Sequence, residues 1–285
     1  MNELGSVTYL MEDPREAARL EAKVDPRAWV QKYLAHRVRP GSEVLSVGCG
    51  PGVILQAVAA LHPSIRGAGI DISPSRIEEA IQRSGGNPQV KFVVGDGQAM
   101  RFPSDSFDLV YSRMLLEYLQ KKEAVVAEMV RVCKPGGTVF LQDLDGQLLW
   151  HYPEDPAMQP VIQRVVEGLA ASGFDPFVGR KLFSLACGAA LQNVDVQVES
   201  YHLIAGEAEP HILRQWELKL DIAAPQMAKV LGSKVEAQGL TRKFLEYLSR
   251  PDTLTYSTVF TVSGQKPFEI GTHRVWSAAD GCLSS

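Results

Sequence analysis

A glycine-rich turn between two apolar segments is the part of this sequence best suited to bind a ligand. Residues 44–47 are followed by Gly48, Gly50 and Gly52, and a second apolar segment ends at Asp71. Glycines let the backbone approach a ligand because no Cβ stands in the way, and a helix that starts behind such a turn has unpaired N–H groups. A carboxylate at the tip of the next strand can accept hydrogen bonds from both ribose hydroxyls. The pattern predicts a nucleoside site at the edge of a parallel sheet.

The spacing of the glycines distinguishes between classes of nucleoside site. Dinucleotide sites use G-x-G-x-x-G, whereas this chain has G-x-G-x-G, with Val53 where the third glycine of that motif would fall. The turn resembles motif I of the class I S-adenosylmethionine (SAM) dependent methyltransferases. The resemblance implies that Gly48, Cys49 and Gly50 make room for the methionine part of SAM and that Asp71 holds its ribose. Taken alone, tight glycine turns also occur in sheets that bind nothing.

Two acidic turns extend this resemblance. It implies that Ile72, next to the ribose acid Asp71, packs on the adenine. It also implies that Asp96 contacts the adenine amino group, with Gly97 and Gln98 along the edge of the ring. Each acid has an alternative interpretation, since Asp71 could cap the helix that follows it and Asp96 could be a turn carboxylate after a strand.

Two longer segments continue the resemblance along the chain. Residues 102–112 look like the corresponding segment of small-molecule methyltransferases of the ubiquinone-biosynthesis type, and residues 128–137 agree with the same group. The resemblance places Ser112 and Arg113 at the methionine end of SAM. Four motifs in the expected order and at the expected separations indicate the family far more strongly than any one of them.

The chain departs from the family pattern at two positions. An acid that would hold the methionine ammonium group usually stands two residues before the first glycine, where this chain has Ser46. A hydroxyl accepts a hydrogen bond but brings no charge, so we expect weaker SAM binding or a substitute acid. Where the family commonly has a histidine, this chain has Tyr118, which is either an aromatic wall of the pocket or a general base.

Candidates for a general base are few. A sulfonium methyl group is already activated for in-line displacement, so the protein mainly has to bind, aim and exclude water, although a phenol, hydroxyl or acidic carbon would benefit from a base. Besides Tyr118, the candidates are His151 and Asp143, at or just after the fifth predicted strand. Each could equally be a surface group or a satisfied polar group. Metal-ligand spacing such as H-E-x-x-H is absent from the sequence, so no metal is expected.

The N-terminal residues resemble a lid. Residues 8–10 and 16–20 are similar to the lid helix of natural-product methyltransferases. This resemblance implies that Tyr9 closes over the cofactor and that Arg19 stabilises the lid or the carboxylate end. The alternative is an ordinary amphipathic helix with a solvated arginine.

Strand and helix patterns alternate and predict an α/β fold with a doubly wound, Rossmann-like sheet of seven strands. The resemblance implies a parallel sheet with an antiparallel last strand. The predicted strands are Glu43–Val47, Gly67–Asp71, Val90–Gly95, Phe107–Ser112, Thr138–Asp143, Asp195–Glu199 and Thr258–Val262.

Three parts follow from this pattern: N-terminal lid helices at 1–42, a SAM-binding domain at 43–267 and a C-terminal tail at 268–285. Two insertions, at about 146–192 and 207–252, interrupt the domain. They lie near the carboxyl ends of strands, where open α/β sheets bind ligands. We therefore expect helices that form a cap over the acceptor, the alternative being that they only extend the core.

Composition excludes several classes of protein. Of the 285 residues, 45% are hydrophobic and 22% are charged, as in ordinary globular domains. The apolar segments are shorter than the roughly 18 residues that a spanning helix needs, and the first residues do not form a signal peptide, so no membrane association is expected. A net charge of -4 argues against nucleic acid as a partner. Four scattered cysteines imply neither zinc nor disulfides and fit a cytoplasmic location.

Together these patterns predict a SAM-dependent methyltransferase that methylates an O, N or C atom of a small, partly apolar metabolite. The missing acid at Ser46 keeps open an alternative, a SAM-fold protein without a methylating role, such as a cyclase, a decarboxylase or a regulatory binding module. A nicotinamide oxidoreductase is disfavoured because G-x-G-x-x-G is absent. No sequence feature indicates an oligomeric state.

Overall fold

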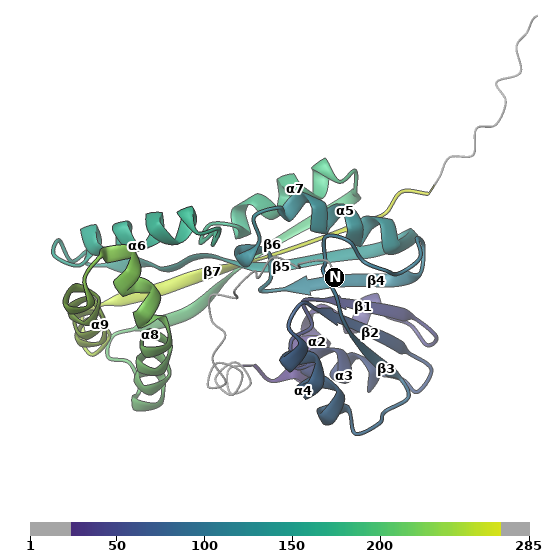
Figure 1. Cartoon of the computed structure of the whole chain (residues 1–285), viewed down its shortest axis with the longest axis horizontal. Coiled ribbons are helices and arrows are strands. Elements are labelled where there is room, and N and C mark those ends of the chain that lie inside the picture. The colour runs from purple at the N-terminus through teal and green to yellow at the C-terminus, as the bar shows by residue number, and fades with distance from the viewer. Residues whose placement is uncertain (1–23, 269–285) are drawn as a thin grey trace, which may run out of the picture.

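Seven strands form one mixed sheet in the computed structural model, which describes residues 24–268 (Figure 1). They are β1 (Glu43–Val47), β2 (Arg66–Asp71), β3 (Val90–Val94), β4 (Phe107–Arg113), β5 (Cys133–Tyr152), β6 (Gln192–Ala205) and β7 (Leu254–Gln265). The order across the sheet is β3-β2-β1-β4-β5-β7-β6. The pairs among β1 to β5 are parallel, and β7 is antiparallel to both of its neighbours. The predicted seven-stranded, Rossmann-like sheet is confirmed.

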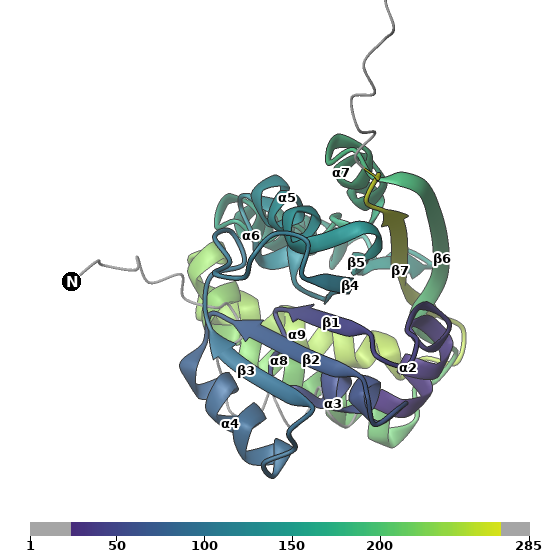
Figure 2. The same ribbon diagram turned by 90° about the vertical axis from the view of Figure 1, so that its right-hand side faces the viewer.

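Helices cover both faces of the parallel part of this sheet. One face carries α2 (Pro26–Tyr33), α3 (Val53–Ala59) and α4 (Pro74–Ser84), and the other carries α5 (Lys122–Val132) and α7 (Leu182–Gly188) (Figure 2). Each face has its own apolar core, with Trp29 and Phe140 in the first and Met129 and Leu182 in the second. Strands that are covered on both faces read as continuous apolar segments, which is why their positions were visible in the sequence.

The last three strands of the sheet, β5, β6 and β7, are longer than predicted. The parts of these strands that extend beyond the core form an arm. β5 continues to Tyr152, whereas the predicted strand ended at Asp143. Its register with β7 shifts after Asp145, and pairing resumes at Trp150. Such an irregularity disrupts the alternation of side chains between the two faces and bends the strand. The sequence pattern therefore indicated a shorter strand than the one that forms.

Three helices pack on the arm and form a cap. They are α6 (Gln159–Ala171), α8 (Pro210–Leu231) and α9 (Lys234–Leu248). Buried Trp216, Leu220, Phe244 and Leu248 belong to their common apolar core. Figure 1 shows α8 and α9 at the opposite end of the long strands from the core helices α2 to α4. The two predicted insertions contain these cap helices, although α7, in the first insertion, packs on the core sheet.

The described part of the predicted lid, residues 24–42, packs on the sheet. The indole Nε1 of Trp29 in α2 donates a hydrogen bond of 2.9 Å to Oε1 of Gln142 in β5. Tyr9 and Arg19, on which the lid prediction depends, lie outside the described residues, as does the predicted tail beyond Phe268. Between residues 24 and 268, no helix is long and apolar enough to cross a membrane.

Candidate functional site

The glycine loop joins β1 to α3 with three glycines in the left-handed region. Gly48, Gly50 and Gly52 have φ angles of +67°, +52° and +75°. A Cβ on Gly52 would lie 2.6 Å from the ring of Phe92, so packing inside the protein requires this glycine. A Cβ on Gly50 would meet only the Arg76 guanidinium, at 3.7 Å. The loop is tightly packed at Gly52 and open at Gly50, which lines a cavity.

Asp71, at the end of β2, holds this loop in place. Its Oδ2 accepts a hydrogen bond from the Gly50 amide at 2.9 Å, and its Oδ1 accepts one from the Ser73 amide at 3.0 Å. The bond from Ser73 agrees with the alternative interpretation, in which Asp71 organises the start of the next helix. A carboxylate can accept about four hydrogen bonds. Both oxygens can therefore still accept a ribose hydroxyl.

A second acidic turn follows β3. Oδ1 of Asp96 accepts a hydrogen bond from the Gln98 amide at 2.8 Å, as expected of a turn carboxylate. Asp96, Gly97 and Gln98 line the same cavity as Asp71, and so does Ile72. The side chain of Ile72 is 44% exposed, so its apolar surface is available for packing. The ends of β2 and β3 thus bring two separate predicted segments together.

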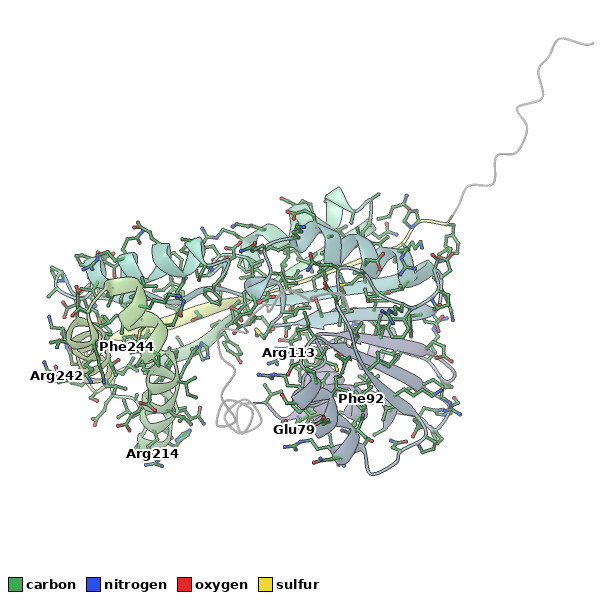
Figure 3. All side chains as sticks on the ribbon, viewed as in Figure 1. Glu79, Phe92, Arg113, Arg214, Arg242 and Phe244 are labelled. Carbon is green, nitrogen blue, oxygen red and sulfur yellow. The ribbon has the colours of Figure 1, made fainter. Side chains whose placement is uncertain are left out.

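One large cavity, of about 880 Å³, connects the carboxyl ends of the parallel strands with the helical cap. This volume is at the upper end of the range, roughly 300–1,000 Å³, that small-molecule sites occupy. Figure 3 shows Arg113 on the core side and Phe244 in the cap, and both line the cavity. The predicted site residues in its lining are Ser46, Gly48, Cys49, Gly50, Asp71, Ile72, Asp96, Gly97, Gln98, Arg113 and Tyr118.

The predicted methionine end of the site contains hydroxyls and one guanidinium group. Ser46 and Tyr111 are partners across the β1–β4 ladder, and both line the cavity. The Cζ atom of Arg113 lies 5.6 Å from the ring centroid of Trp29. The buried Nε atom of Arg113 has no hydrogen-bond partner within residues 24–268. Ser112, by contrast, is 1% exposed and is not part of the lining. Of the predicted pair, only Arg113 therefore reaches the cavity.

The candidates for a general base lie in different surroundings. Tyr118 lines the cavity, whereas His151 does not. The ring of His151 packs against the rings of Phe244 and Tyr247, and its Nδ1 is hydrogen bonded to Oγ1 of Thr255 at 3.1 Å. His151 is thus buried under the cap and its Nδ1 is hydrogen bonded. It lies there because the part of β5 that carries it belongs to the arm.

Asp143, the third candidate, bonds to the backbone. Its Oδ2 accepts hydrogen bonds from the amides of Leu115 and Leu116, at 3.1 and 2.7 Å, and its Oδ1 accepts one from Leu144 at 3.1 Å. These bonds hold a short 3₁₀ turn after β4, η2 (Leu116–Tyr118). Asp143 is fully buried and does not line the cavity. It positions the η2 turn and does not meet a ligand there.

The η2 turn presents a carboxyl group that the sequence patterns did not single out. Glu117 is 2% exposed and lines the cavity, and its Oε2 has no hydrogen-bond partner in the described part of the chain. Lys219 of α8 lines the same cavity from the cap and is also buried. The two residues are far apart in the sequence and belong to no common motif. Spacing alone could not have paired them.

Glu117 has an unusual proton affinity. Burial, and then the neighbouring Asp143 carboxylate, raise the pKa of Glu117 to about 8, although Lys219, a hydrogen bond from the Tyr118 side chain and Arg113 act in the opposite direction. Burial also raises the pKa of Asp143, but hydrogen bonds from backbone amides lower it. The net pKa of Asp143 is about 7. Because these amides favour its charged form, Asp143 releases its proton at a lower pH than Glu117.

The cap is attached to the core next to Glu117. The backbone amide of Asp175, in the loop after α6, donates a hydrogen bond of 2.7 Å to the carbonyl oxygen of Glu117. The rings of Tyr118 and Phe174 pack with their centroids 5.4 Å apart. Both contacts hold the cap over the carboxyl end of β4, where the two halves of the cavity meet.

These features define an α/β domain with a glycine-rich loop at the edge of its parallel strands and an added helical cap. Residues 45–141 match a family model described as a methyltransferase domain. Together with the strand order and the glycine loop, this match shows that the segment is similar to the class I methyltransferase domain, a family whose cofactor is SAM. The open space at Gly50 and the remaining acceptor capacity of Asp71 fit that cofactor.

Two curated relatives match part of the chain. A 2-methyl-6-phytyl-1,4-hydroquinone methyltransferase from Synechocystis sp. is 33% identical over 129 residues, which are 44% of this chain and 40% of that protein. An ajmaline N-methyltransferase from Rauvolfia serpentina is 34% identical over 137 residues, which are 45% of this chain and 44% of that protein. The chain spans less than half the length of these relatives.

A solved structure is similar over more of the chain. A putative methyltransferase from Bacillus halodurans superposes with a TM-score of 0.57 at 18% identity, and the match covers 85% of this chain and 99% of that one. At this identity the similarity shows the fold, which agrees with the seven-stranded sheet described above.

Proposed function

We propose that the chain is a SAM-dependent methyltransferase whose acceptor is a small, partly apolar molecule bound under the cap. The supporting observation is the single cavity that connects the glycine loop and Asp71 with α6, α8 and α9. A methyl donor and its acceptor must be held in contact with water excluded, and the lining of this cavity comes from both the core and the cap. When bound, SAM supplies a methyl group that is already activated for displacement.

The ends of β2 and β3 are assigned to the adenosine part of SAM. In this proposal the Asp71 carboxylate accepts hydrogen bonds from the ribose hydroxyls, and Ile72 packs on the adenine. Asp96, with Gly97 and Gln98, lies along the edge of the ring. All five line the cavity, and within residues 24–268 each Asp71 oxygen accepts one hydrogen bond from the backbone.

The loop after β1 and the end of β4 are assigned to the methionine part. Gly48, Cys49 and Gly50 leave space for it, and Ser46 would accept a hydrogen bond from its ammonium group. Arg113 is a half-buried residue of the lining, and its buried Nε atom has no hydrogen-bond partner among residues 24–268, which suits a carboxylate. We assign no role to Ser112, which is not in the lining.

The cap half of the cavity is assigned to the acceptor. Its walls include Ile162, Val165, Leu220, Met227 and Phe244, which are apolar and come from all three cap helices. Apolar walls with a few polar groups are typical of sites for small organic molecules. The names of the two curated relatives, which mention a phytyl hydroquinone and ajmaline, support a small-molecule acceptor.

Calorimetric titration with SAM tests the cofactor half of the proposal. We expect Asp71→Ala to weaken binding by about tenfold or more, which corresponds to at least ~1.4 kcal/mol, and Asp252→Ala, an exposed acid in an ion pair with Arg250, to leave it unchanged. Equal affinities of wild type and Asp71→Ala would remove the ribose assignment. A wild-type protein that does not bind SAM would contradict the proposed function.

Mass spectrometry distinguishes methyl transfer from a binding role. The protein and SAM are incubated with fractionated small-molecule extracts, and any compound that gains one methyl mass identifies an acceptor. Such a gain excludes a purely regulatory role. Thermal stabilisation by NADH and not by SAM would instead support a nicotinamide-dependent function.

A further inference from the structure

A carboxyl group of the core and an ammonium group of the cap both line the cavity. Glu117 belongs to the η2 turn of the core, and Lys219 belongs to α8 of the cap. Both side chains are buried, with exposures of 2% and 8%. The Nζ atom of Lys219 also lies 4.8 Å from the ring centroid of Trp216. Two groups of opposite charge are therefore held where the core and the cap meet.

One oxygen of Glu117 remains available to a ligand. Oε2 is buried and has no hydrogen-bond partner among residues 24–268. A buried polar atom without a partner costs roughly 1–3 kcal/mol, more when it is charged, and is rare in native proteins. Because Glu117 lines the cavity, a molecule bound there can donate the missing hydrogen bond.

The charges around Glu117 are unevenly distributed. Asp143 of β5 lies behind it and bonds to the backbone, outside the cavity lining. Arg113 of β4 and Lys219 of α8 are cations in the lining, and His202 of β6 is there as well. Glu117 is therefore the carboxyl group close to the cations Lys219 and Arg113, which act on its pKa, whereas the other acids in the lining, Asp71 and Asp96, follow β2 and β3.

We propose that Glu117 accepts the proton of an acidic hydroxyl on the methyl acceptor, that Lys219 stabilises the resulting oxygen anion, and that the acceptor is a phenol or an enol with an apolar body. This inference rests on the methyltransferase function proposed above. Tyr118, one of the sequence-based candidates for the base, is then a positioning residue, because its side chain donates a hydrogen bond to Glu117.

The proton and the electrons balance in this step. The O–H bond of the acceptor breaks, and its proton passes to Oε2 of Glu117. The acceptor oxygen bonds to the methyl carbon while the bond between that carbon and sulfur breaks, and sulfur keeps the electron pair. The products are a methylated oxygen, a neutral thioether and a protonated Glu117, which returns its proton to water. A base works best when its pKa lies near the working pH, and burial brings the pKa of Glu117 to about 8.

Two other kinds of acceptor suit this arrangement less well, one because of its charge and one because it has no proton to give. An ammonium group would be a third cation beside Arg113 and Lys219, and like charges repel strongly where water is excluded. A carboxylic acid arrives ionised at neutral pH and has no proton for Glu117 to accept. A phenol or enol enters neutral and becomes anionic next to Lys219, which can then form a charge-assisted hydrogen bond.

The rest of the acceptor would lie along the cap. The part of the lining that comes from the cap helices consists mostly of aliphatic and aromatic side chains. These residues are Ile162, Val165, Leu169, Leu220, Met227 and Phe244. An alkyl or fused-ring body bound against them buries apolar surface at roughly 25 cal/mol per Å².

Model compounds with one tail and different head groups test the acceptor class. 4-Octylphenol, octylamine and octanoate are titrated into the full chain in the presence of saturating S-adenosylhomocysteine, at a pH of about 8. We expect 4-octylphenol to bind at least about tenfold more tightly than the other two. The ultraviolet difference spectrum of the bound compound should contain the phenolate band, which reports ionisation independently of methyl transfer.

Two variants test the residues separately. Glu117→Gln keeps the size of the side chain but removes the base, so we expect loss of the phenolate band and a decrease of about 100-fold or more in methylation of 4-octylphenol, measured by mass spectrometry. Lys219→Met removes the ammonium group and should weaken 4-octylphenol binding about tenfold. Glu123→Gln in α5 and Lys229→Met in α8 are exposed controls that should behave like wild type.

The outcomes separate this inference from the proposed function. Wild-type protein that binds S-adenosylhomocysteine but prefers octylamine or octanoate, or binds none of the three compounds, overturns the acceptor class. A phenolate band that persists in both variants overturns the roles of Glu117 and Lys219. Weaker S-adenosylhomocysteine binding by Glu117→Gln would assign Glu117 to the cofactor and overturn its acceptor role. Failure of wild type to bind S-adenosylhomocysteine contradicts the proposed function itself.

Discussion

The carboxylate of Asp71 and the backbone amide of Gly50 are joined by a hydrogen bond of 2.9 Å. This bond connects the end of β2 with the loop after β1, so two motifs that are separate in the sequence form one site. The same carboxylate that is assigned to the ribose also orients the loop. A change at Asp71 should therefore affect both functions.

Asp71→Asn separates these two contributions. Its amide oxygen can still accept the bond from Gly50, but the charge that strengthens a ribose contact is lost. We expect SAM affinity to fall less than in Asp71→Ala, with the alanine variant weaker by a further factor of about 3–10. Calorimetry measures both, and identical losses would mean that the bond to Gly50 does not matter for binding.

Gly52→Ala should destabilise the protein through packing as well as through backbone strain. Gly52 has a φ angle of +75°, and an added Cβ would lie 2.6 Å from the Phe92 ring. Gly85 also has a positive φ, +55°, but nothing lies within 4 Å of its Cβ position. We expect a loss of about 2–4 kcal/mol for Gly52→Ala and about 1 kcal/mol for Gly85→Ala in urea unfolding. Equal losses would show that contact with Phe92 contributes nothing.

Ser46→Asp should strengthen SAM binding. Ser46 lines the cavity at the position where the family usually has an acid, and a carboxylate there would add a charge-assisted hydrogen bond to the methionine ammonium group. We expect an increase in affinity of about tenfold by calorimetry, and a small decrease for Ser46→Ala. Weaker binding by Ser46→Asp would indicate that the ammonium group lies elsewhere.

Glu117 should make the folded protein less stable as the pH rises. Its pKa is raised from 4.5 to about 8, so between these values the folded protein retains a proton that the unfolded chain has released. Stability therefore falls through this window, by up to about 1.4 kcal/mol per pH unit, and the raised pKa of Asp143 acts in the same direction. The cations Arg113 and Lys219 reduce the effect without reversing it.

Urea unfolding at several pH values between about 5 and 8 tests this dependence. Glu117→Gln should show a flatter fall in the free energy of unfolding than wild type. Glu123→Gln, an exposed change of the same chemistry, should follow the wild-type curve. Parallel curves for wild type and Glu117→Gln would contradict the raised pKa.

His151→Ala should reduce stability and leave SAM affinity unchanged. His151 is 9% exposed, packs on Phe244 and Tyr247 and does not line the cavity. Removing the ring leaves a void under the cap, at an expected loss of roughly 2–4 kcal/mol. Thermal unfolding and SAM calorimetry measure the two effects. A variant of normal stability that no longer methylates an identified acceptor would restore His151 as a catalytic candidate.

The core of the fold could be predicted because its signals are local. Apolar segments mark strands that are covered on both faces, Ser73-Pro74 marks the start of α4, and the glycines mark a turn with positive φ angles. Each signal depends on residues that are close in the sequence. Asp71 could be placed beside the glycine loop for the same reason, since adjacent parallel strands end at one edge of a sheet.

The arm, the cap and the acceptor half of the cavity were decided by the tertiary structure. The register shift after Asp145 hides the continuation of β5 from pattern recognition and carries His151 into the cap core. Asp143 turns inward to backbone amides, and Glu117 meets the cavity that Lys219 lines from the cap. The amino-acid sequence alone determined where the predicted cofactor motifs lie, because each motif consists of residues that are close together in the chain. Only folding decided which distant side chains share a cavity, because that depends on strand register and on how helices pack across the arm.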